Sequence, residues 1–323
     1  MNKSKLNKLL SIVIPAHNEQ IGISDALTEI ISVLSGCDIA WEIIVVDDGS
    51  SDNTFKTLRK FAENDPRVKG VRFSRNFGKE SALLAGLNIA KGDAVVTMDS
   101  DLQHPPNVIP MMIEKWQQGY RIVDGVKRSR ENDSMFTRLR ANIFNTVLSK
   151  LGGVSLQDSS DFKLLDRLIV DTIIADFPEK QRFYRGLTDW VGFKRDKILF
   201  DVEERLTGEG KWSVWSLIRL AITAMVSFTS APLQIITILG FLTLALGFFV
   251  AADALVTWSY GIAVSGFATI IITLLIIGSF IMISLGIIGE YIAKIYDEIK
   301  SRPHYIIEAT LGVDDKKKED QRW

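Results

Sequence analysis

Two carboxylates in the spacing Asp-x-Asp, Asp99 and Asp101, are the residues of this sequence most suited to chemistry. They directly follow the apolar run of residues 94–98, and two prolines end the stretch shortly afterwards. Short apolar runs are typical of buried strands, and open α/β sheets bind ligands beyond the carboxyl ends of their strands. Mg²⁺ prefers carboxylate oxygens and usually shares its coordination shell with substrate phosphates. The pattern therefore indicates a divalent-cation site, with Gln103 close behind, although two solvated loop acids would give the same pattern.

The surrounding sequence predicts the sheet that positions these acids. Short apolar runs alternate with segments whose apolar residues recur at helical spacing. The expected strands are residues 10–15, 41–46, 68–73, 94–98, 120–126 and 193–203, and the expected helices cover 21–34, a segment ending at 61, and 81–90. This alternation is typical of an α/β fold whose mostly parallel sheet is covered by helices on both faces.

Acids stand at three of the expected strand ends, and the carboxyl-end rule places them on one edge of the sheet. They are Glu19, Asp47 with Asp48, and Asp99 with Asp101. The loop containing Arg75 and Lys79 adds positive charge nearby, a combination that suits a metal-bound nucleotide diphosphate. The sequence contains neither G-x-x-x-x-G-K-[ST] nor G-x-G-x-x-G, which disfavours a P-loop ATPase and a Rossmann dehydrogenase.

Further basic residues follow the strand expected at 120–126. They include Lys127, Arg128, Arg130, Arg138, Arg140 and Arg205. Arginine is suited to bidentate phosphate contacts, but a solvated helix face would also account for these residues. Asp158 and Asp161 lie in a short polar loop before an apolar segment expected to be helical, where an acid also serves as a helix cap.

The length, charge and cysteine content limit the classes of protein to which the chain can belong. The chain has 323 residues, a formal net charge of -1 and one cysteine, Cys37. The length allows about two domains, and the charge argues against general nucleic-acid binding. One cysteine excludes an internal disulfide and any cysteine-based zinc site.

The carboxyl-terminal third is expected to contact a membrane. Residues 212–225 have the pattern of an amphipathic interfacial helix with tryptophans at headgroup depth, and the apolar runs at 232–257 and 266–293 each exceed the length that spans a bilayer. Basic residues flank the pair on its outer sides, whereas the connector has none. By the positive-inside rule we expect a hairpin in the cell's plasma membrane, with the amino-terminal domain and both termini in the cytoplasm. The expected division is therefore a catalytic domain at 1–210, a juxtamembrane segment at 211–231, two transmembrane helices within 232–295 and a tail at 296–323.

Four segments in order resemble the GT-A fold family 2 glycosyltransferases. They are SIVIPAHNE (11–19), VVDDGSSDNT (45–54), RNFGK (75–79) and MDSDLQHPP (98–106). The later segments QRFYRG (181–186) and RLTG (205–208), followed by two membrane helices, resemble the polyprenyl-phosphate glycosyltransferases, bacterial relatives of the dolichol-phosphate mannose and glucose synthases. The resemblance extends to about residue 302.

This resemblance implies that a sugar moves, with inversion, from a nucleotide sugar, usually UDP-linked, to a polyprenyl phosphate such as undecaprenyl phosphate. The product would be a lipid-linked sugar donor for cell-envelope glycans. Mg²⁺ or Mn²⁺ would be bound by Asp99 and Asp101, with Gln103 as a further ligand. The nucleotide-binding positions would be Pro15, His17, Glu19, Asp47, Asp48, Lys79, Asp99 and Ser100. Arg128, Arg138, Arg140 and Arg205 would contact acceptor or donor phosphates.

Asp161 resembles the acidic residue beside the reacting centre. A phosphate acceptor is largely a dianion at neutral pH, so a strong general base is not obligatory. Asp161 could then position the sugar or the acceptor, or stabilise positive charge at C1, whereas an alcohol acceptor would require it as a base. One departure from the family pattern is Lys163, which stands where members commonly have arginine.

Two rival functions remain. A processive polysaccharide synthase has a similar catalytic domain, but its Gln-x-x-Arg-Trp motif precedes several more membrane helices, whereas here Gln-Arg-Trp occurs only at residues 321–323. A non-catalytic sugar-nucleotide-binding scaffold is disfavoured because every acid of the metal site is present. Small residues in the second apolar run, such as Gly278 and Gly286, agree with a homo-oligomer such as a tetramer.

Overall fold

The computed structural model describes residues 8–128, 160–177, 179, 183–201, 231–261 and 266–313. It divides into two compact units. Of the described residues, the first comprises 8–128, 160–177, 179, 183–201 and 302–313, and the second comprises 231–261 and 266–301. The expected amphipathic segment at 212–225 lies outside the described residues, as do Arg138, Arg140 and Arg205.

The first unit is built on a mixed sheet with the strand order β7-β5-β6-β4-β1-β2-β3-β8. The strands are β1 (Leu9–Ala16), β2 (Ala40–Asp47), β3 (Val68–Phe73), β4 (Ala94–Thr97), β5 (Ile122–Lys127), β6 (Lys163–Asp166), β7 (Arg195–Phe200) and β8 (Ile307–Leu311). The pairs β4-β1, β1-β2, β2-β3 and β5-β7 are parallel. The expected mostly parallel α/β sheet is therefore confirmed.

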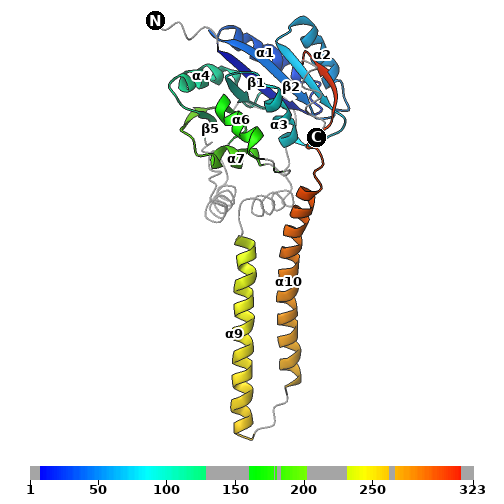
Figure 1. Cartoon of the computed structure of the whole chain (residues 1–323), viewed down its shortest axis with the longest axis vertical. Helices are drawn as coiled ribbons and strands as arrows, with labels where there is room; N and C mark the ends of the chain where they lie inside the picture. Colours follow the sequence, from blue (N-terminus) through cyan, green and yellow to red (C-terminus); the bar gives the residue numbers. More distant parts are fainter. Residues whose placement is uncertain are drawn as a thin grey trace. The chain divides into compact units, whose positions relative to one another are not determined.

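Helices cover both faces of this sheet (Figure 1). One core contains α1 (Ile23–Ser35), α2 (Thr54–Asn64) and α4 (Ile109–Gln117), and the other contains α3 (Lys79–Ile89), α6 (Arg167–Ala175) and α7 (Tyr184–Trp190). Side chains of a strand alternate between faces, so Ile12 packs in the first core while its neighbour Val13 packs in the second. Both side chains are fully buried, and this packing on both faces holds β1 and its carboxyl end in place.

Two strands differ from the sequence expectation. The segment after Asp161 was expected to pass from a loop into an apolar helix, but the structure places β6 between Asp161 and α6. This strand pairs antiparallel with both β4 and β5. β6 has only four residues, so the alternation of its side chains cannot be distinguished in the sequence from the apolar pattern of the helix that follows.

The other difference is β8, which lies in the segment expected to be a tail. Residues of β8 pair antiparallel with β3 at the edge of the sheet. Just before it, the Tyr305 ring stacks on Phe73 with centroids 4.9 Å apart. The segment that follows α10 (Phe267–Ile299) of the second unit therefore contributes a strand to the sheet of the first unit.

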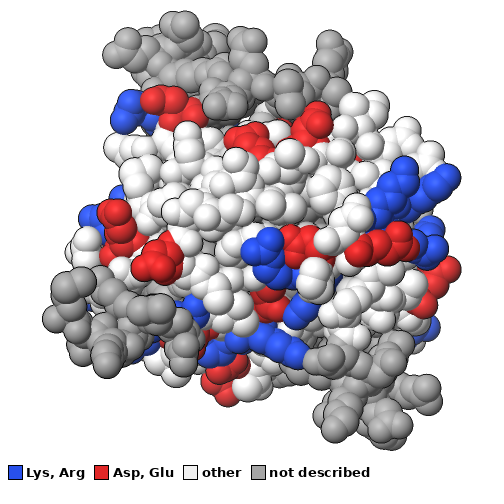
Figure 2. Space-filling model, turned by 90° about the horizontal axis from the view of Figure 1, so that it is seen from above, with Lys and Arg blue, Asp and Glu red and all other residues white. Residues whose placement is uncertain are grey.

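Acidic and basic side chains lie side by side on the face of the molecule seen in Figure 2. Ion pairs between charged side chains also connect neighbouring strands of the sheet. Arg72 Nε, for example, lies 3.3 Å from Glu308 Oε2, which joins β3 to β8. Such partly exposed pairs contribute little individually.

The second unit contains the helices α9 (Ala231–Ser259) and α10 (Phe267–Ile299), which pack beside each other (Figure 1). Both are long and apolar enough to cross a membrane, within Leu233–Ser259 and Ile270–Ile299. Their large apolar side chains, such as Phe248 and Leu275, are mostly exposed. This is the reverse of a soluble core helix, whose apolar stripe is buried.

Candidate active site

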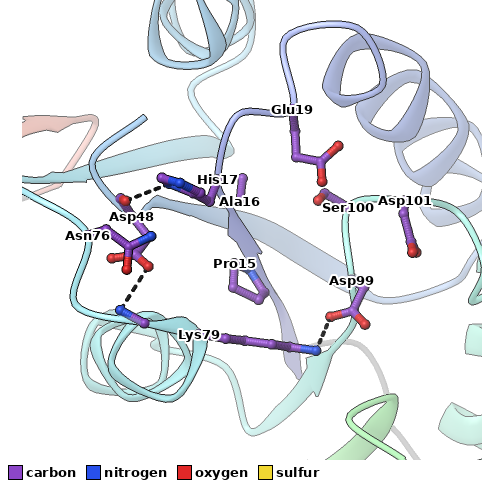
Figure 3. Close-up of a pocket in the computed structure, with 11 residues that line it drawn as sticks. Pro15, Ala16, His17, Glu19, Asp48, Asn76, Lys79, Asp99, Ser100 and Asp101 are labelled. Atoms are coloured by element: carbon purple, nitrogen blue, oxygen red, sulfur yellow. Dashed lines mark hydrogen bonds and ion pairs between the residues drawn. The ribbon is translucent and has the colours of Figure 1, made fainter. Parts of the chain in front are cut away.

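A cavity of about 310 Å³ opens where β1, β2 and β4 end (Figure 3). Its wall contains Pro15, Ala16, His17, Glu19, Asp48, Asn76, Gly78, Lys79, Asp99, Ser100 and Asp101. Seven of the eight expected nucleotide-binding positions thus line one cavity, and Asp47 is the exception. The parallel register explains this convergence, because the carboxyl ends of β1, β2 and β4 lie at the same edge of the sheet.

Asp48 connects two of the loops that form the cavity. Its carboxylate accepts hydrogen bonds from the backbone N–H groups of Phe77 and Gly78, at 2.7 and 2.9 Å. Its carbonyl oxygen lies 2.9 Å from His17 Nδ1. Gly49 follows with φ +65°, and a Cβ there would lie only 2.3 Å from the Arg75 carbonyl carbon. A glycine is required for this close approach, which holds the basic loop against the end of β2.

Asp47 lies behind the cavity wall and does not line it. Its side chain is fully buried, and Oδ1 accepts a hydrogen bond of 2.9 Å from the Ser50 backbone. The other oxygen lies 3.7 Å from Arg72 Nε. These contacts give Asp47 a role in shaping the loop, while direct contact with a nucleotide stays a prediction.

Lys79 joins the two acidic positions that the sequence singled out separately. Its Nζ lies 2.6 Å from Asp99 Oδ1 and 2.6 Å from Asp161 Oδ2. Burial opposes the charge of this ammonium, but the two carboxylates outweigh it and raise the pKa of Lys79. Lys79 therefore stays protonated and balances the negative charge of Asp99 at the cavity (Figure 3).

Asp161 is held by a second cation as well. Arg185 Nε donates to Oδ1 at 2.7 Å, and Arg185 Nη2 donates to Oδ2 at 2.8 Å. Burial alone would favour the neutral acid. The hydrogen bonds from Arg185 and the charge of Lys79 nevertheless hold the pKa of Asp161 well below its usual range. Asp161 is thus a firmly ionised and weakly basic carboxylate in this arrangement.

The Asp-x-Asp turn has an unusual backbone. Leu102 adopts φ +56°, a region that bulky residues rarely enter, and the Asp101 carboxylate accepts a 3.1 Å hydrogen bond from the Gln103 backbone. Gln103 Oε1 accepts from Lys127 Nζ at 3.4 Å, so metal ligation by Gln103 would require this contact to change and stays a prediction. The turn leaves the Asp101 carboxylate on the cavity wall (Figure 3).

The chemistry of the cavity fits a divalent cation shared with a ligand. Within the described ranges, no three His, Cys, Asp or Glu side chains are grouped closely enough to hold a metal alone. Burial raises the pKa of Glu19, and Asp101, Asp52 and Asp99 raise it further. The cavity therefore has an excess of negative charge that a cation would relieve. Two carboxylates plus substrate phosphates are the usual surroundings of Mg²⁺.

Three residues at the site lie in the sequence motifs, but the sequence alone predicts no role for them. Arg185 lies in the basic and aromatic motif at 181–186 and binds Asp161. Asn76 lies in the RNFGK loop and lines the cavity. His104 follows the Asp-x-Asp turn, where its ring stacks on Phe162 and accepts from the Asp99 backbone at 3.4 Å. Burial lowers the pKa of His104, so it acts here as a neutral structural residue.

Of the four arginines expected to contact phosphates, only Arg128 is described. Its Nη1 lies 3.1 Å from Asp201 Oδ2, and both side chains are largely exposed. Arg128 does not line the cavity. Its phosphate contact stays a prediction, as do those of Arg138, Arg140 and Arg205 outside the described residues.

Comparison with known proteins identifies the family. Residues 11–183 match the family described as glycosyl transferase family 2. The chain is a family 2 glycosyltransferase. It is 38% identical over 307 residues to an uncharacterized glycosyltransferase of Synechocystis sp., covering 94% of this chain and 96% of that protein. It is also 36% identical to a prophage bactoprenol glucosyl transferase homolog of Escherichia coli, covering 92% and 98%.

The expected enzyme class and GT-A-type fold are thereby confirmed. Among solved structures, this glycosyltransferase has a low similarity to glucosyl-3-phosphoglycerate synthase from Mycobacterium tuberculosis, with 23% identity, a TM-score of 0.44, and coverage of 68% of this chain and 77% of that one. The family match includes the cavity and Asp161 and ends two residues before Arg185. The two relatives also cover the length of the chain in which α9 and α10 occur.

Proposed function

We propose that this glycosyltransferase transfers a sugar from a UDP-linked donor to a polyprenyl phosphate. The observation that carries the proposal is the convergence of Lys79 and Arg185 on Asp161 beside the Asp-x-Asp turn. Both oxygens of Asp161 accept from these cations, which leaves a poor general base. A phosphate acceptor needs no base, because its second pKa is about 6 and it is already a dianion at neutral pH.

The reaction is a displacement at the anomeric carbon of the donor. An oxygen of the acceptor phosphate forms the new bond to C1, and the bond from C1 to the diphosphate oxygen breaks, so UDP leaves with the bonding electrons. The anomeric configuration inverts. Lys79 and Arg185 supply positive charge beside the reacting groups, and Asp161 fixes both cations in place. No proton transfer is needed in this step.

The donor would occupy the cavity at the strand ends. His17 and Asp48 form its wall on the side opposite Asp101, with Pro15 between the two sides, and the side of His17 and Asp48 suits the nucleoside (Figure 3). The diphosphate would then lie near Asp99 and Asp101. Those two carboxylates would hold Mg²⁺ or Mn²⁺, which when bound supplies charge neutralisation for the leaving diphosphate.

The helices α9 and α10 would anchor the enzyme in the plasma membrane, where its lipid substrate is found. Because β8 belongs to the same sheet as β1 to β7, the segments before α9 and after α10 must lie on one side of the bilayer. Two spans satisfy this requirement. With the basic residues of the outer flanks, the positive-inside rule places the catalytic unit in the cytoplasm.

The site disfavours the two rival functions. A polysaccharide synthase extends an alcohol and would need a free base, whereas Asp161 is held by two cations. A scaffold without activity would have no reason to keep Lys79 within 2.6 Å of both Asp99 and Asp161. The relatives named as bactoprenol glucosyl transferases support a lipid carrier as the acceptor.

A donor screen tests the proposal. Purified full-length enzyme in detergent, Mg²⁺ and undecaprenyl phosphate are mixed with radiolabelled UDP-glucose, UDP-galactose, UDP-N-acetylglucosamine or UDP-4-amino-arabinose. We expect label from one donor in the organic phase, lost with EDTA and in Asp101→Ala. Free UDP or a growing polymer, without labelled lipid from any donor, would contradict the assigned acceptor.

A further inference from the structure

The helix α7 delivers Arg185 to Asp161, and its position depends on several buried contacts. The Tyr184 hydroxyl lies 3.0 Å from Thr97 Oγ1, and that oxygen donates in turn to the Asp161 carbonyl at 2.6 Å. Glu80 accepts from the Tyr184 backbone N–H at 2.9 Å. The first turn of α7 is thereby connected to the strand end that carries Asp161.

Lys163 makes the corresponding contact to the second turn of α7. It is the first residue of β6, two residues after Asp161, and only 1% of it is exposed. Its Nζ donates to Thr188 Oγ1 at 2.7 Å and lies 5.3 Å from the centre of the Tyr184 ring. Thr188 Oγ1 in turn donates to the Arg185 carbonyl at 3.0 Å, so the chain of bonds reaches the residue that binds Asp161.

A buried ammonium is costly without a partner, and Lys163 has one in Asp124 of β5. Asp124 Oδ1 lies 3.4 Å from Lys163 Nζ, while Asp124 Oδ2 lies 4.0 Å from Arg195 Nε. Arg195 continues the network to α7 by donating to the Thr188 carbonyl at 2.6 Å and by pairing with Asp189. The charges on β5, β6 and β7 therefore converge on one face of α7.

The geometry points to Lys163 as a positioning residue for sugar transfer, because its buried ammonium fixes α7 so that Arg185 meets Asp161. This inference rests on the proposed function, since transfer to the lipid phosphate is the activity that it affects. Lys163 does not line the cavity, and the donor-binding wall comes from other elements. Loss of Lys163 should therefore reduce turnover without weakening donor binding.

The test compares kcat and the donor KM in the full-length chain. We expect Lys163→Met to lower kcat at least about tenfold and to leave the donor KM within about twofold. Thr188→Val keeps the volume of its side chain, removes the acceptor of the Lys163 hydrogen bond and should lower kcat in the same way. In an Arg185→Met background, Lys163→Met should change kcat by less than about twofold, because the residue through which it acts is gone.

Lys69→Met is the matched control. Lys69 Nζ pairs with the buried Glu42 at 2.5 Å on β2 and β3, away from α7, so its loss should lower the melting temperature and leave kcat unchanged. Unchanged kcat in both Lys163→Met and Thr188→Val would overturn the inference. An equal loss from Lys163→Met with and without Arg185 would also overturn it, since that result marks a general structural effect. Should Lys163→Met fail to fold, Thr188→Val decides alone.

Wild-type transfer is measured first in the same preparation. If the wild type transfers no sugar to polyprenyl phosphate, the proposed function fails and this inference fails with it. A wild-type rate with unaffected variants overturns only the role of Lys163.

Discussion

Arg185 binds Asp161 through two parallel hydrogen bonds, from Nε to Oδ1 at 2.7 Å and from Nη2 to Oδ2 at 2.8 Å. Bidentate pairs of this kind fix orientation as well as charge. With Lys79 also on Oδ2, Asp161 is better suited to hold two cations beside the reacting centre than to remove a proton. The sequence leaves open whether Asp161 is a base or a positioning group, and these contacts favour positioning.

The first prediction concerns Asp161→Asn. We expect kcat to fall at least about 100-fold, because a neutral amide cannot hold Arg185 and Lys79 together. The pKa of Asp161 lies well below its usual range, so the wild-type carboxylate is ionised at neutral pH, whereas an amide in its place gains no charge as the pH rises. The rate of the variant should therefore stay low up to pH 9.5. A full recovery at high pH would show that Asp161 acts as a base.

The second prediction concerns competition between Lys79 and the metal. Lys79 places an ammonium 2.6 Å from Asp99, and a divalent cation on the same carboxylate would be repelled by it. Both side chains are partly exposed, which moderates the effect. Lys79→Met should bind Mn²⁺ about tenfold more tightly without nucleotide, measured by electron paramagnetic resonance of free Mn²⁺, while its transfer rate falls. Unchanged or weaker Mn²⁺ binding would show that Lys79 does not compete with the metal for Asp99.

The third prediction concerns Glu80, whose pKa burial raises to about 7. In the unfolded chain the Glu80 carboxyl has a pKa of about 4.3, so it loses its proton at a lower pH than in the folded protein. The free energy of unfolding therefore decreases as the pH rises from about 4 through 7. Glu80→Gln retains an acceptor for the Tyr184 N–H and lacks the titration. The free energy of unfolding of Glu80→Gln, relative to that of the wild type, should increase by about 2 kcal/mol between pH 5 and 8. Melting temperatures of both proteins across this range test it, and a constant difference would be the contrary result.

The fourth prediction concerns topology. In a Cys37→Ser background, a cysteine at Ser259, at the end of α9, should react with an impermeant maleimide added outside intact cells. A cysteine at Arg302, which enters the segment joined to the sheet, should react only after lysis. Labelling of both from outside would rule out a hairpin with a cytoplasmic catalytic unit.

The parts of the site that the sequence predicted well are those fixed by strand ends. Apolar runs such as residues 10–15 and 94–98 gave the strands, and the carboxyl-end rule then brought Glu19, Asp48 and Asp99 to one edge. The rule does not tell which side of the backbone an acid faces. Asp47 and Asp48 are adjacent, yet only Asp48 lines the cavity, because successive side chains alternate across a strand end.

The remaining features depend on contacts between distant segments. The strand β8 follows two long apolar helices, and nothing in its local sequence shows that it pairs with β3. Arg185 and Asp161 are 24 residues apart and come together through tertiary contacts, such as the hydrogen bond from Lys163 of β6 to Thr188 of α7. Lys163 looks like a surface residue by type, but tertiary packing buries it.

The products of a single turnover test the central claim most directly. Full-length enzyme is incubated with undecaprenyl phosphate, Mg²⁺ and the donor found in the screen, and the lipid and nucleotide products are identified by mass spectrometry. We predict a lipid that carries one sugar on its original single phosphate, together with an equal amount of UDP. A lipid diphosphate with release of UMP, or UDP release without a lipid product, would contradict the transfer that we propose for this site.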